Sequence, residues 1–167
     1  MGREFDGSGD LITVTDSTEI QDIYDGSGGQ SFAWVAPQTD GENNNAAVMS
    51  KNPSGSDGSW SIFVQNDDAT KTKHNLQQLF DGNDGNWNTS AVQIRKNDGY
   101  TLVFWTYDSD APGNNPTLYT YHPTDGFQTL TVGSGLTEIG TPTGTRETDV
   151  GNNLGIGYRD RDWETRV

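Results

Sequence analysis

Apolar and polar residues alternate along most of the chain, with the period of two that a β-strand shows and an α-helix does not. In SWSIFVQ at 59–65, for example, Trp60, Ile62 and Val64 fall on one face of an extended segment. Clusters rich in Gly, Asp, Asn and Pro interrupt such runs about every ten residues. The pattern predicts an all-β chain of many short antiparallel strands.

Two stretches depart from this pattern. Residues 16–24, DSTEIQDIY, place apolar side chains at helical spacing behind Asp16 or Ser17, which are good helix N-caps. Residues 70–79, TKTKHNLQQL, form a second and less regular candidate. The sequence therefore predicts one short helix over 16–24 and admits another over 70–79.

The segment at 100–122, YTLVFWTYDSDAPGNNPTLYTYH, predicts a β-hairpin rich in aromatic residues. Its arms run over 100–107 and 117–122, around a loop of Asp, Pro, Gly and Asn. One face of the first arm is a natural core face. That face carries Tyr100, Leu102 and Phe104.

We interpret the opposite face of the hairpin as a strip of four rings. Trp105 and Tyr107 come from the first arm, and Tyr119 and Tyr121 from the second. Three roles remain open for this strip. It is a core face, a platform on which sugar C–H groups stack while phenols bind hydroxyls, or a contact surface for another chain.

Composition agrees with a single folded domain over residues 1–167. This length suffices for one core, and five Trp, six Tyr and six Phe bury large areas although only 30% of residues are apolar. No cysteine is present, so no disulfide bond forms. No apolar run approaches the length of a membrane span, and MGREFDGSGD lacks the apolar region of a secretion signal, so we expect neither membrane insertion nor a signal peptide.

Charge indicates the surroundings of the protein. Asp plus Glu number 24 against 10 Lys plus Arg, which gives a net charge of −14. Such a surface repels nucleic acid and anionic membranes, so we expect neither as a partner. Because salt screens the self-repulsion, we expect a high-salt environment; an ordinary acidic extracellular domain is the alternative.

Several motifs occur in an order that is typical of one family. They are REFDGSGDLITVTDSTEIQDI, SFAWVAPQTDGENNNAAVMSK, SWSIFV, TLVFWTYD, TLYTYHPTDG and NNLGIGYRD. Over residues 3–160 this series resembles the laminin-G-like branch of the concanavalin A-like lectin and glucanase superfamily. The resemblance implies a two-sheet antiparallel jelly-roll β-sandwich. It also implies relatives that mostly bind carbohydrate or protein, some of them with calcium at the rim.

The resemblance and the local sequence indicate where the remaining tryptophans lie. Trp34, in FAWV, and Trp60 lie in short runs that match buried positions of the family, so we expect both in the core. Trp87, beside the turn sequence DGNDGN, and Trp163, near the end of the chain, are expected to be exposed.

The end of the chain departs from the family pattern. These domains usually continue past the motif matched by NNLGIGYRD into a further strand, whereas this chain ends with RDRDWETRV. Either WETRV is that strand in shortened form, or one sheet edge is open. Because open edge strands recruit other chains, we expect an oligomer or a neighbouring subunit at this edge.

Catalytic chemistry lacks its usual parts. His74 and His122 have no nucleophile motif around them, and we expect each at the surface or at a strand end. Glycosidases of the family carry two Glu and an Asp close together on one strand. Here the nearest acidic pairs, at 4–6 and 147–149, lack the second Glu. We therefore expect no enzymatic activity, with glycoside hydrolysis as a less favoured alternative.

Asp108 and Asp110 are the best candidates for a metal site. They lie two residues apart on the loop that leaves the first hairpin arm, with Asn114 and Asn115 nearby. Ca²⁺ prefers several carboxylate and amide oxygens. The alternative is turn formation, in which these side chains bond their own backbone. Bound calcium is thus one of two expectations for this loop.

Together these features predict a non-enzymatic surface module for recognition or assembly. The favoured context is the virion of a halophile's virus, as a capsid decoration or tail-fibre part that packs with neighbouring subunits, binds host glycan, or does both. The alternative is an independent carbohydrate-binding domain at a cell surface or outside the cell. A glycan or neighbouring protein subunits are therefore the expected partners.

Overall fold

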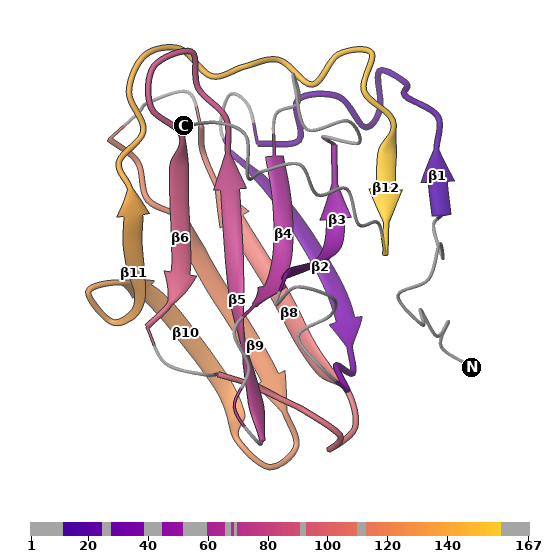
Figure 1. Ribbon diagram of the computed structural model, residues 1–167, viewed down its shortest axis with the longest axis vertical. Helices are drawn as coiled ribbons and strands as arrows, with labels where there is room; N and C mark the ends of the chain where they lie inside the picture. Colours follow the sequence, from indigo (N-terminus) through magenta and orange to yellow (C-terminus); the bar gives the residue numbers. More distant parts are fainter. Residues whose placement is uncertain are drawn as a thin grey trace.

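In the computed structural model the described residues form an all-β protein (Figure 1). These residues are 12–24, 28–38, 45–51, 60–65, 68, 70–90, 93–109 and 113–157. Every regular element among them is a β-strand, which confirms the all-β prediction. The same residues contain no helix long and apolar enough to span a membrane.

Twelve strands are found in the described part of the chain. They are β1 (Ile12–Val14), β2 (Gly29–Val35), β3 (Asn45–Ser50), β4 (Trp60–Gln65), β5 (Lys71–Gln78), β6 (Gly85–Thr89), β7 (Ile94–Arg95), β8 (Thr101–Tyr107), β9 (Thr117–His122), β10 (Gly126–Val132), β11 (Gly135–Gly140) and β12 (Leu154–Ile156). β8 and β9 are the two arms of the hairpin that the sequence predicts.

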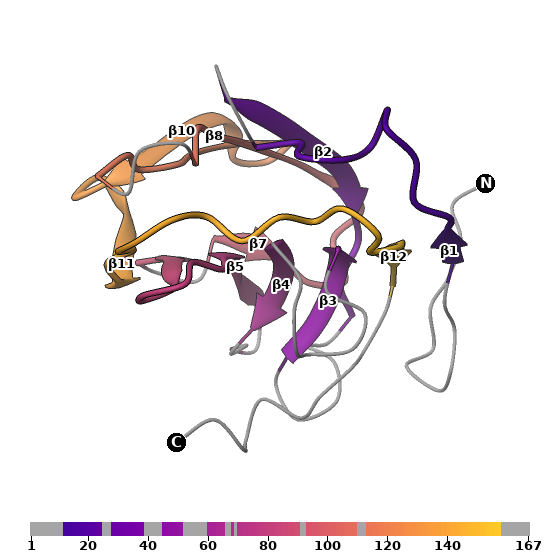
Figure 2. The ribbon, with the colours of Figure 1, turned by 90° about the horizontal axis from the view of Figure 1, so that it is seen from above.

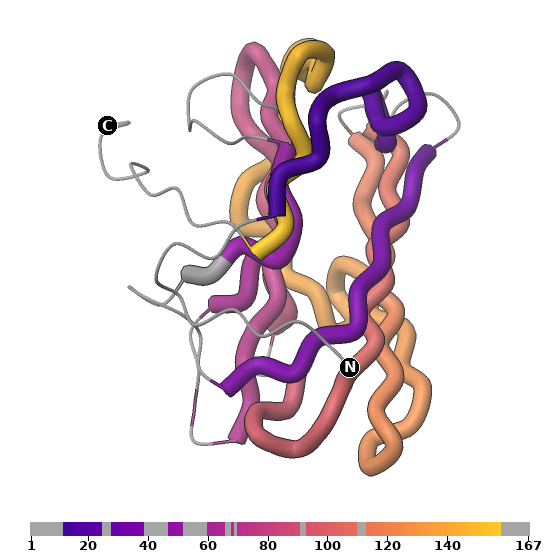
Figure 3. Tube along the Cα trace, turned by 90° about the vertical axis from the view of Figure 1, so that its right-hand side faces the viewer, coloured from indigo at the N-terminus to yellow at the C-terminus, as the bar shows by residue number. Residues whose placement is uncertain are grey.

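The strands form one curled mixed sheet, hydrogen-bonded in the order β1-β12-β3-β4-β5-β6-β11-β10-β9-β8-β2, with β7 pairing β5 at the side. The pairs are antiparallel except β10 with β11. The curl brings β2, β8 and β10 over β3, β4 and β5 (Figure 2), and Figure 3 shows the two layers from the side. We call β2, β8, β9 and β10 the four-strand half. The long half consists of β1, β12, β3, β4, β5, β6 and β11, with β7 beside β5.

The chain passes from one half to the other at a tight corner between β10 and β11. Gly133 and Gly135 have φ angles of 81° and 91° there, which other residues rarely adopt. A Cβ atom on Gly135 would lie 2.1 Å from Cδ2 of Leu130, which is buried in the core. These glycines allow β10 to end in one layer and β11 to begin in the other.

The core lies between the two halves. Its buried members are Tyr24, Trp60, Ile62, Leu76, Trp87, Ile94, Val103, Trp105, Tyr107, Leu118, Leu130 and Leu136. Ring contacts join distant segments: Tyr24 meets Trp60 edge-on at 5.2 Å between centroids, and Trp87 lies 4.9 Å from Tyr107. Aromatic packing of this kind fills a core that has few apolar residues.

Strand alternation decides where each tryptophan lies. Trp60 is buried as expected. The expectation for Trp34 is wrong, since it is 56% exposed while its neighbours Ala33 and Val35 pack against the core. The expectation for Trp87 is also wrong. Side chains on β6 alternate between the two faces, and Trp87 is on the inward face, where it is fully buried. Trp163 lies outside the described residues.

Neither candidate helix forms. Residues 70–79 contain β5, whose alternating pattern places Leu76 in the core. Residues 16–24 are irregular and make turns. Asp16 does not cap a helix; it accepts hydrogen bonds from Lys51 Nζ at 2.7 Å and from the backbone of Gly151 at 2.7 Å. Tertiary contacts thus override the local helical signal.

A buried ion cluster holds this segment in place. Lys51 is fully buried and lies 2.7 Å from Asp16 and 3.5 Å from the fully buried Asp149. It also donates to the carbonyl of Ile20 at 2.9 Å. The Lys51 hydrogen bond, followed by that of Gln21, lowers the pKa of Asp16 to about 2. The cluster joins the end of β3 to segments near both ends of the described chain.

The final motif of the series pairs as an inner strand. β12 contains the Leu, Gly and Ile of NNLGIGYRD, and it lies between β1 and β3. The segment WETRV, at 163–167, lies outside the described residues, so the expectation of an open edge beside it stays a prediction.

Candidate functional site

The four-ring strip that the sequence suggests is divided between two faces of the sheet. Trp105 and Tyr107 on β8 are 0% and 3% exposed and belong to the core. Tyr119 is half-buried and Tyr121 is 41% exposed on the other face of β9. The first two rings therefore have the core role, and only the last two remain available to a ligand.

The hairpin register explains this division. Trp105 lies opposite Leu118, and Phe104 lies opposite Tyr119. Pairing Trp105 with Tyr119 instead would require a register shifted by one residue. Because side chains alternate between faces, such a shift exchanges the core face of one arm for its outer face.

The outer side of the four-strand half carries the largest group of exposed rings among the described residues. Cross-strand pairing assigns the side chains to this side. Its aromatic members are Phe32, Trp34, Phe104, Tyr119, Tyr121 and Phe127. Its remaining strand positions are Gln30, Leu102, Thr106, Thr117, Thr129 and Thr131. We call this surface the aromatic face; none of these side chains is charged.

The first row of the aromatic face crosses three strands. Phe32 on β2 pairs with Phe104 on β8, which pairs with Tyr119 on β9. The rings of Phe104 and Tyr119 lie 5.6 Å apart, and Tyr119 stacks on Phe127 of β10 at 5.9 Å with 23° between their planes. Contact between neighbouring rings restricts their rotamers, so the row offers a preformed apolar surface.

The second row lies one step along the strands. Trp34 pairs with Leu102, Leu102 with Tyr121, and Tyr121 with Phe127. Trp34 and Phe127, at the two ends, are 56% and 66% exposed. Large exposed rings are uncommon on a soluble domain, and a contiguous group of them marks an interaction surface.

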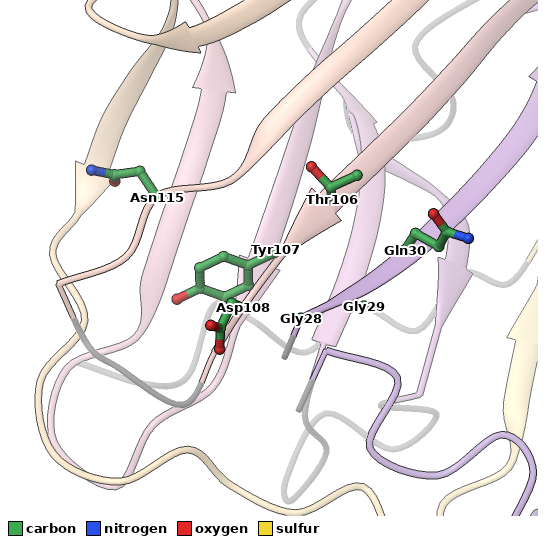
Figure 4. A pocket seen from close by; sticks show the side chains of 7 residues that line it. All are labelled: Gly28, Gly29, Gln30, Thr106, Tyr107, Asp108 and Asn115. Carbon is green, nitrogen blue, oxygen red and sulfur yellow. The ribbon is translucent and has the colours of Figure 1, made fainter. Parts of the chain in front are cut away.

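A shallow pocket of about 480 Å³ adjoins one end of the aromatic face (Figure 4). Gln30 and Thr106 belong to both, and Tyr107, Asp108 and Asn115 complete the polar lining with two glycines. Burial, followed by the charge of Asp108, raises the pKa of Tyr107, so its hydroxyl stays protonated. That hydroxyl is itself buried, so the groups that the pocket offers for hydrogen bonding are those of Gln30, Thr106, Asp108 and Asn115, beside an apolar surface.

Only one of the two residues proposed to bind calcium lies among the described residues. Asp108 lines the pocket, whereas Asp110 lies outside the described residues. Within the described ranges no three His, Cys, Asp or Glu side chains are grouped as metal ligands. A calcium site at this loop stays a prediction from the sequence.

Both histidines have structural positions. The surface expectation for His74 is wrong: it points into the core from β5 and is 0% exposed. His122 ends β9 as expected, accepts from the backbone N–H of Thr124 at 3.1 Å and bonds the carbonyl of Asp98 at 2.6 Å. Neither imidazole has a hydrogen bond to a nucleophilic side chain among the described residues.

The outer side of the long half has a different character. Asn75 on β5 and Asn86 and Asn88 on β6 are joined there by amide hydrogen bonds from Asn75 Nδ2. Pairing places Phe63 next to Asn75 in the same row, but that ring is only 5% exposed. The outward positions of β5 and β6 thus carry amide side chains, whereas the outward positions of the four-strand half carry aromatic rings.

Sequence reasoning missed four of the six rings of the aromatic face. The expectation that Tyr100, Leu102 and Phe104 form a core face is wrong, because Leu102 and Phe104 lie on the outer side of β8 and Tyr100 is 52% exposed. In SFAWV, strict alternation already separates Phe32 and Trp34 from Ser31, Ala33 and Val35. The small and aliphatic residues occupy the inner side, so the larger rings are outside. This alternation was the available signal for the two β2 rings; Phe104 required the hairpin register.

Comparison with known proteins adds no relative. No protein-family model, curated protein or solved structure matches the chain.

Proposed function

We propose that the protein is a non-enzymatic recognition module that binds a neutral carbohydrate chain along the aromatic face. One observation carries the proposal. In a chain with a net charge of −14, the outward strand positions of the four-strand half hold rings, threonines, one leucine and one glutamine, and no charge. An uncharged, ring-rich surface suits a neutral partner.

The geometry of the rows suits a sugar chain. Neighbouring strands lie roughly 4.8 Å apart, a spacing comparable with the length of one pyranose unit. A saccharide lying across the strands, along Trp34, Tyr121 and Phe127, would set successive sugar rings over successive side chains. The C–H faces of sugars stack on such rings, and the tyrosine and threonine hydroxyls supply hydrogen bonds to sugar hydroxyls.

The proposal assigns no catalytic role to any side chain. His74 is enclosed in the core and His122 is bound to the backbone. Asp149, the aspartate of one candidate glycosidase pair, is fully buried beside Lys51. Each of these groups has a structural position, and the rings of the aromatic face act only by contact.

We also propose the finer architecture and setting that the sequence suggests. The curled sheet is a two-sheet jelly-roll sandwich of the laminin-G-like type, and calcium at Asp108 and Asp110 remains part of that proposal. The setting is a virion surface in a high-salt environment, where the module serves as a capsid decoration or tail-fibre part. The acidic composition supports the high-salt setting, since screening weakens self-repulsion.

Assembly with neighbouring subunits is the second candidate function. It is favoured by the edge of β2, which ends the order of the described strands and carries two of the most exposed rings, Phe32 and Trp34. Glycan binding and assembly are compatible, because one uses a face and the other an edge.

The proposal is tested by retention on insoluble chitin, cellulose, mannan and starch. We expect the wild type to be retained on at least one of these neutral polymers. Trp34→Ala and Tyr121→Ala should weaken retention roughly tenfold or more, because each removes a ring on which a sugar unit would stack.

Ile139→Ala is the matched control. Ile139 is 60% exposed, much like Trp34, but it lies on β11 in the long half. Its replacement should leave retention unchanged. No retention of the wild type on any of the four polymers, or equal losses in the Trp34 and Ile139 variants, would contradict the proposal.

A further inference from the structure

Among the described residues, β2 is an end strand with a free edge. It is the last strand in the hydrogen-bonded order and pairs with β8 alone (Figure 1). Within the described part of the chain, no backbone hydrogen bond joins Gly29–Val35 to any other segment. Alternate N–H and C=O groups of β2 therefore point away from β8 without a partner among these residues.

This edge lacks the usual protection against strand pairing. Natural edge strands are shortened, bulged, or marked with charges and prolines. β2 runs over seven residues, GQSFAWV, with no charge and no proline, and its register with β8 is unbroken from Gly29 to Val35. Its length and its lack of charges and prolines indicate that the β2 edge is built to be paired.

The inner side of β2 supports the same conclusion. Ala33 and Val35 pack against the core but remain only partly buried. A further strand alongside β2 would cover their remaining apolar surface and would satisfy the free backbone groups.

We propose that β2 pairs antiparallel with β2 of a second copy of this chain, about a two-fold axis at Phe32. Centring the register there lets all seven residues pair, with Phe32 opposite the partner's Phe32. Gln30 then faces Trp34 on the outer side, and Ser31 faces Ala33 on the inner side. The strand is self-complementary because outer residues meet outer residues and no like charges meet.

Charge restricts the surface through which a second copy can approach. Each copy carries −14, so two copies approach only through an uncharged surface and with salt present. β2 supplies such a surface, and its pairing joins the two four-strand halves into one continuous sheet. The rows through Phe32, Phe104 and Tyr119 of both copies then form one uninterrupted row. This inference does not depend on what the aromatic face binds.

Two equally exposed phenylalanines give a matched test. Phe32 and Phe127 are both 66% exposed and lie on the same face, but Phe127 is on β10, away from the edge. Sedimentation velocity in about 2 M NaCl, where screening is strong, should show a dimer of the wild type. Phe32→Asp brings two carboxylates together and should raise the dimer Kd roughly a hundredfold. Phe127→Asp should leave it unchanged.

A cross-linking experiment checks the register directly. The chain has no cysteine, so a single introduced thiol reports on one position. Opposed residues of antiparallel strands have Cβ atoms about 4.5–5.5 Å apart, close to what a disulfide needs. Under mild oxidation Phe32→Cys should give a covalent dimer in high yield, and Phe127→Cys should not.

A monomeric wild type at about 2 M NaCl, or equal cross-linking of the two cysteine variants, would overturn the proposal. If the wild type is a monomer, the partner of the β2 edge would be a strand of another protein and not a second copy. The outcome is separable from carbohydrate binding, because Phe127→Asp should weaken polysaccharide retention while the dimer persists. Loss of retention with an intact dimer would concern the ligand alone.

Discussion

At the scale of single residues, the core contains polar side chains as well as apolar ones. His74 points inward from β5 and is 0% exposed. Neither of its ring nitrogens has a hydrogen-bond partner among the described residues. Burial lowers the pKa of His74 to about 3, because the charged imidazolium loses its hydration there. The residue is thus a neutral core side chain at physiological pH.

This burial makes stability depend on pH. Above the ordinary His pKa the imidazole is neutral in both the folded and the unfolded state, so protonation of His74 does not affect stability there. Below it the unfolded chain binds a proton that the folded protein cannot bind until the pH approaches 3. Folding should therefore lose up to about 1.4 kcal/mol per pH unit over this interval.

We predict that His74→Leu removes this dependence. Between pH 7 and pH 5, urea unfolding of the wild type should show a loss of about 2 kcal/mol that the variant lacks. At pH 8 the contribution from protonation vanishes, which serves as the internal control. Parallel stability curves for the two proteins from pH 8 to pH 5 would contradict the assignment of His74 to the core.

At the scale of elements, residues 16–24 form no helix and are held in place by the Lys51 cluster. Lys51, directly after β3, binds Asp16 and Asp149, which are far apart in sequence. Trp60 also donates its indole N–H to Asp149 at 3.3 Å. The contacts join the irregular segment to the sheet without regular secondary structure of its own.

We predict that Lys51→Met is strongly destabilising. It leaves the fully buried Asp149 without its cation, and breaking a buried pair in this way costs about 3–5 kcal/mol. The free energy of unfolding in urea measures the loss. Lys73→Met, at a partly exposed position of β5, should change stability by about 0.5 kcal/mol or less. Equal effects of the two substitutions would show that the buried cluster does not hold the fold.

Sequence alone was informative where local alternation decides the structure. It identified β4 and both hairpin arms, and it placed Trp60 in the core. It failed where distant contacts decide. Asp16 looked like a helix cap because its partner Lys51 lies 35 positions away. The four-ring strip failed because alternation fixes faces within one strand, whereas the match between two strands depends on the register of the hairpin.

At the scale of the whole molecule, the fold separates two kinds of surface. A strongly acidic chain presents one uncharged face, and the two ring rows on it come from segments between residues 32 and 127. The edge of that face continues into the unprotected strand β2. Binding by the face and pairing by the edge would together produce a dimer with a doubled contact surface, which raises avidity for a polymer without any new contact.

Tryptophan fluorescence tests the central claim, that the aromatic face is the contact surface. Among the described tryptophans, Trp60, Trp87 and Trp105 are buried and Trp34 is exposed. Soluble oligosaccharides of whichever polymer retains the protein should change the emission of the wild type with a saturable dependence on concentration. Trp34→Phe keeps a ring for stacking but should lose this change. An unchanged wild-type spectrum in the presence of such a ligand, or a full response in Trp34→Phe, would contradict the account.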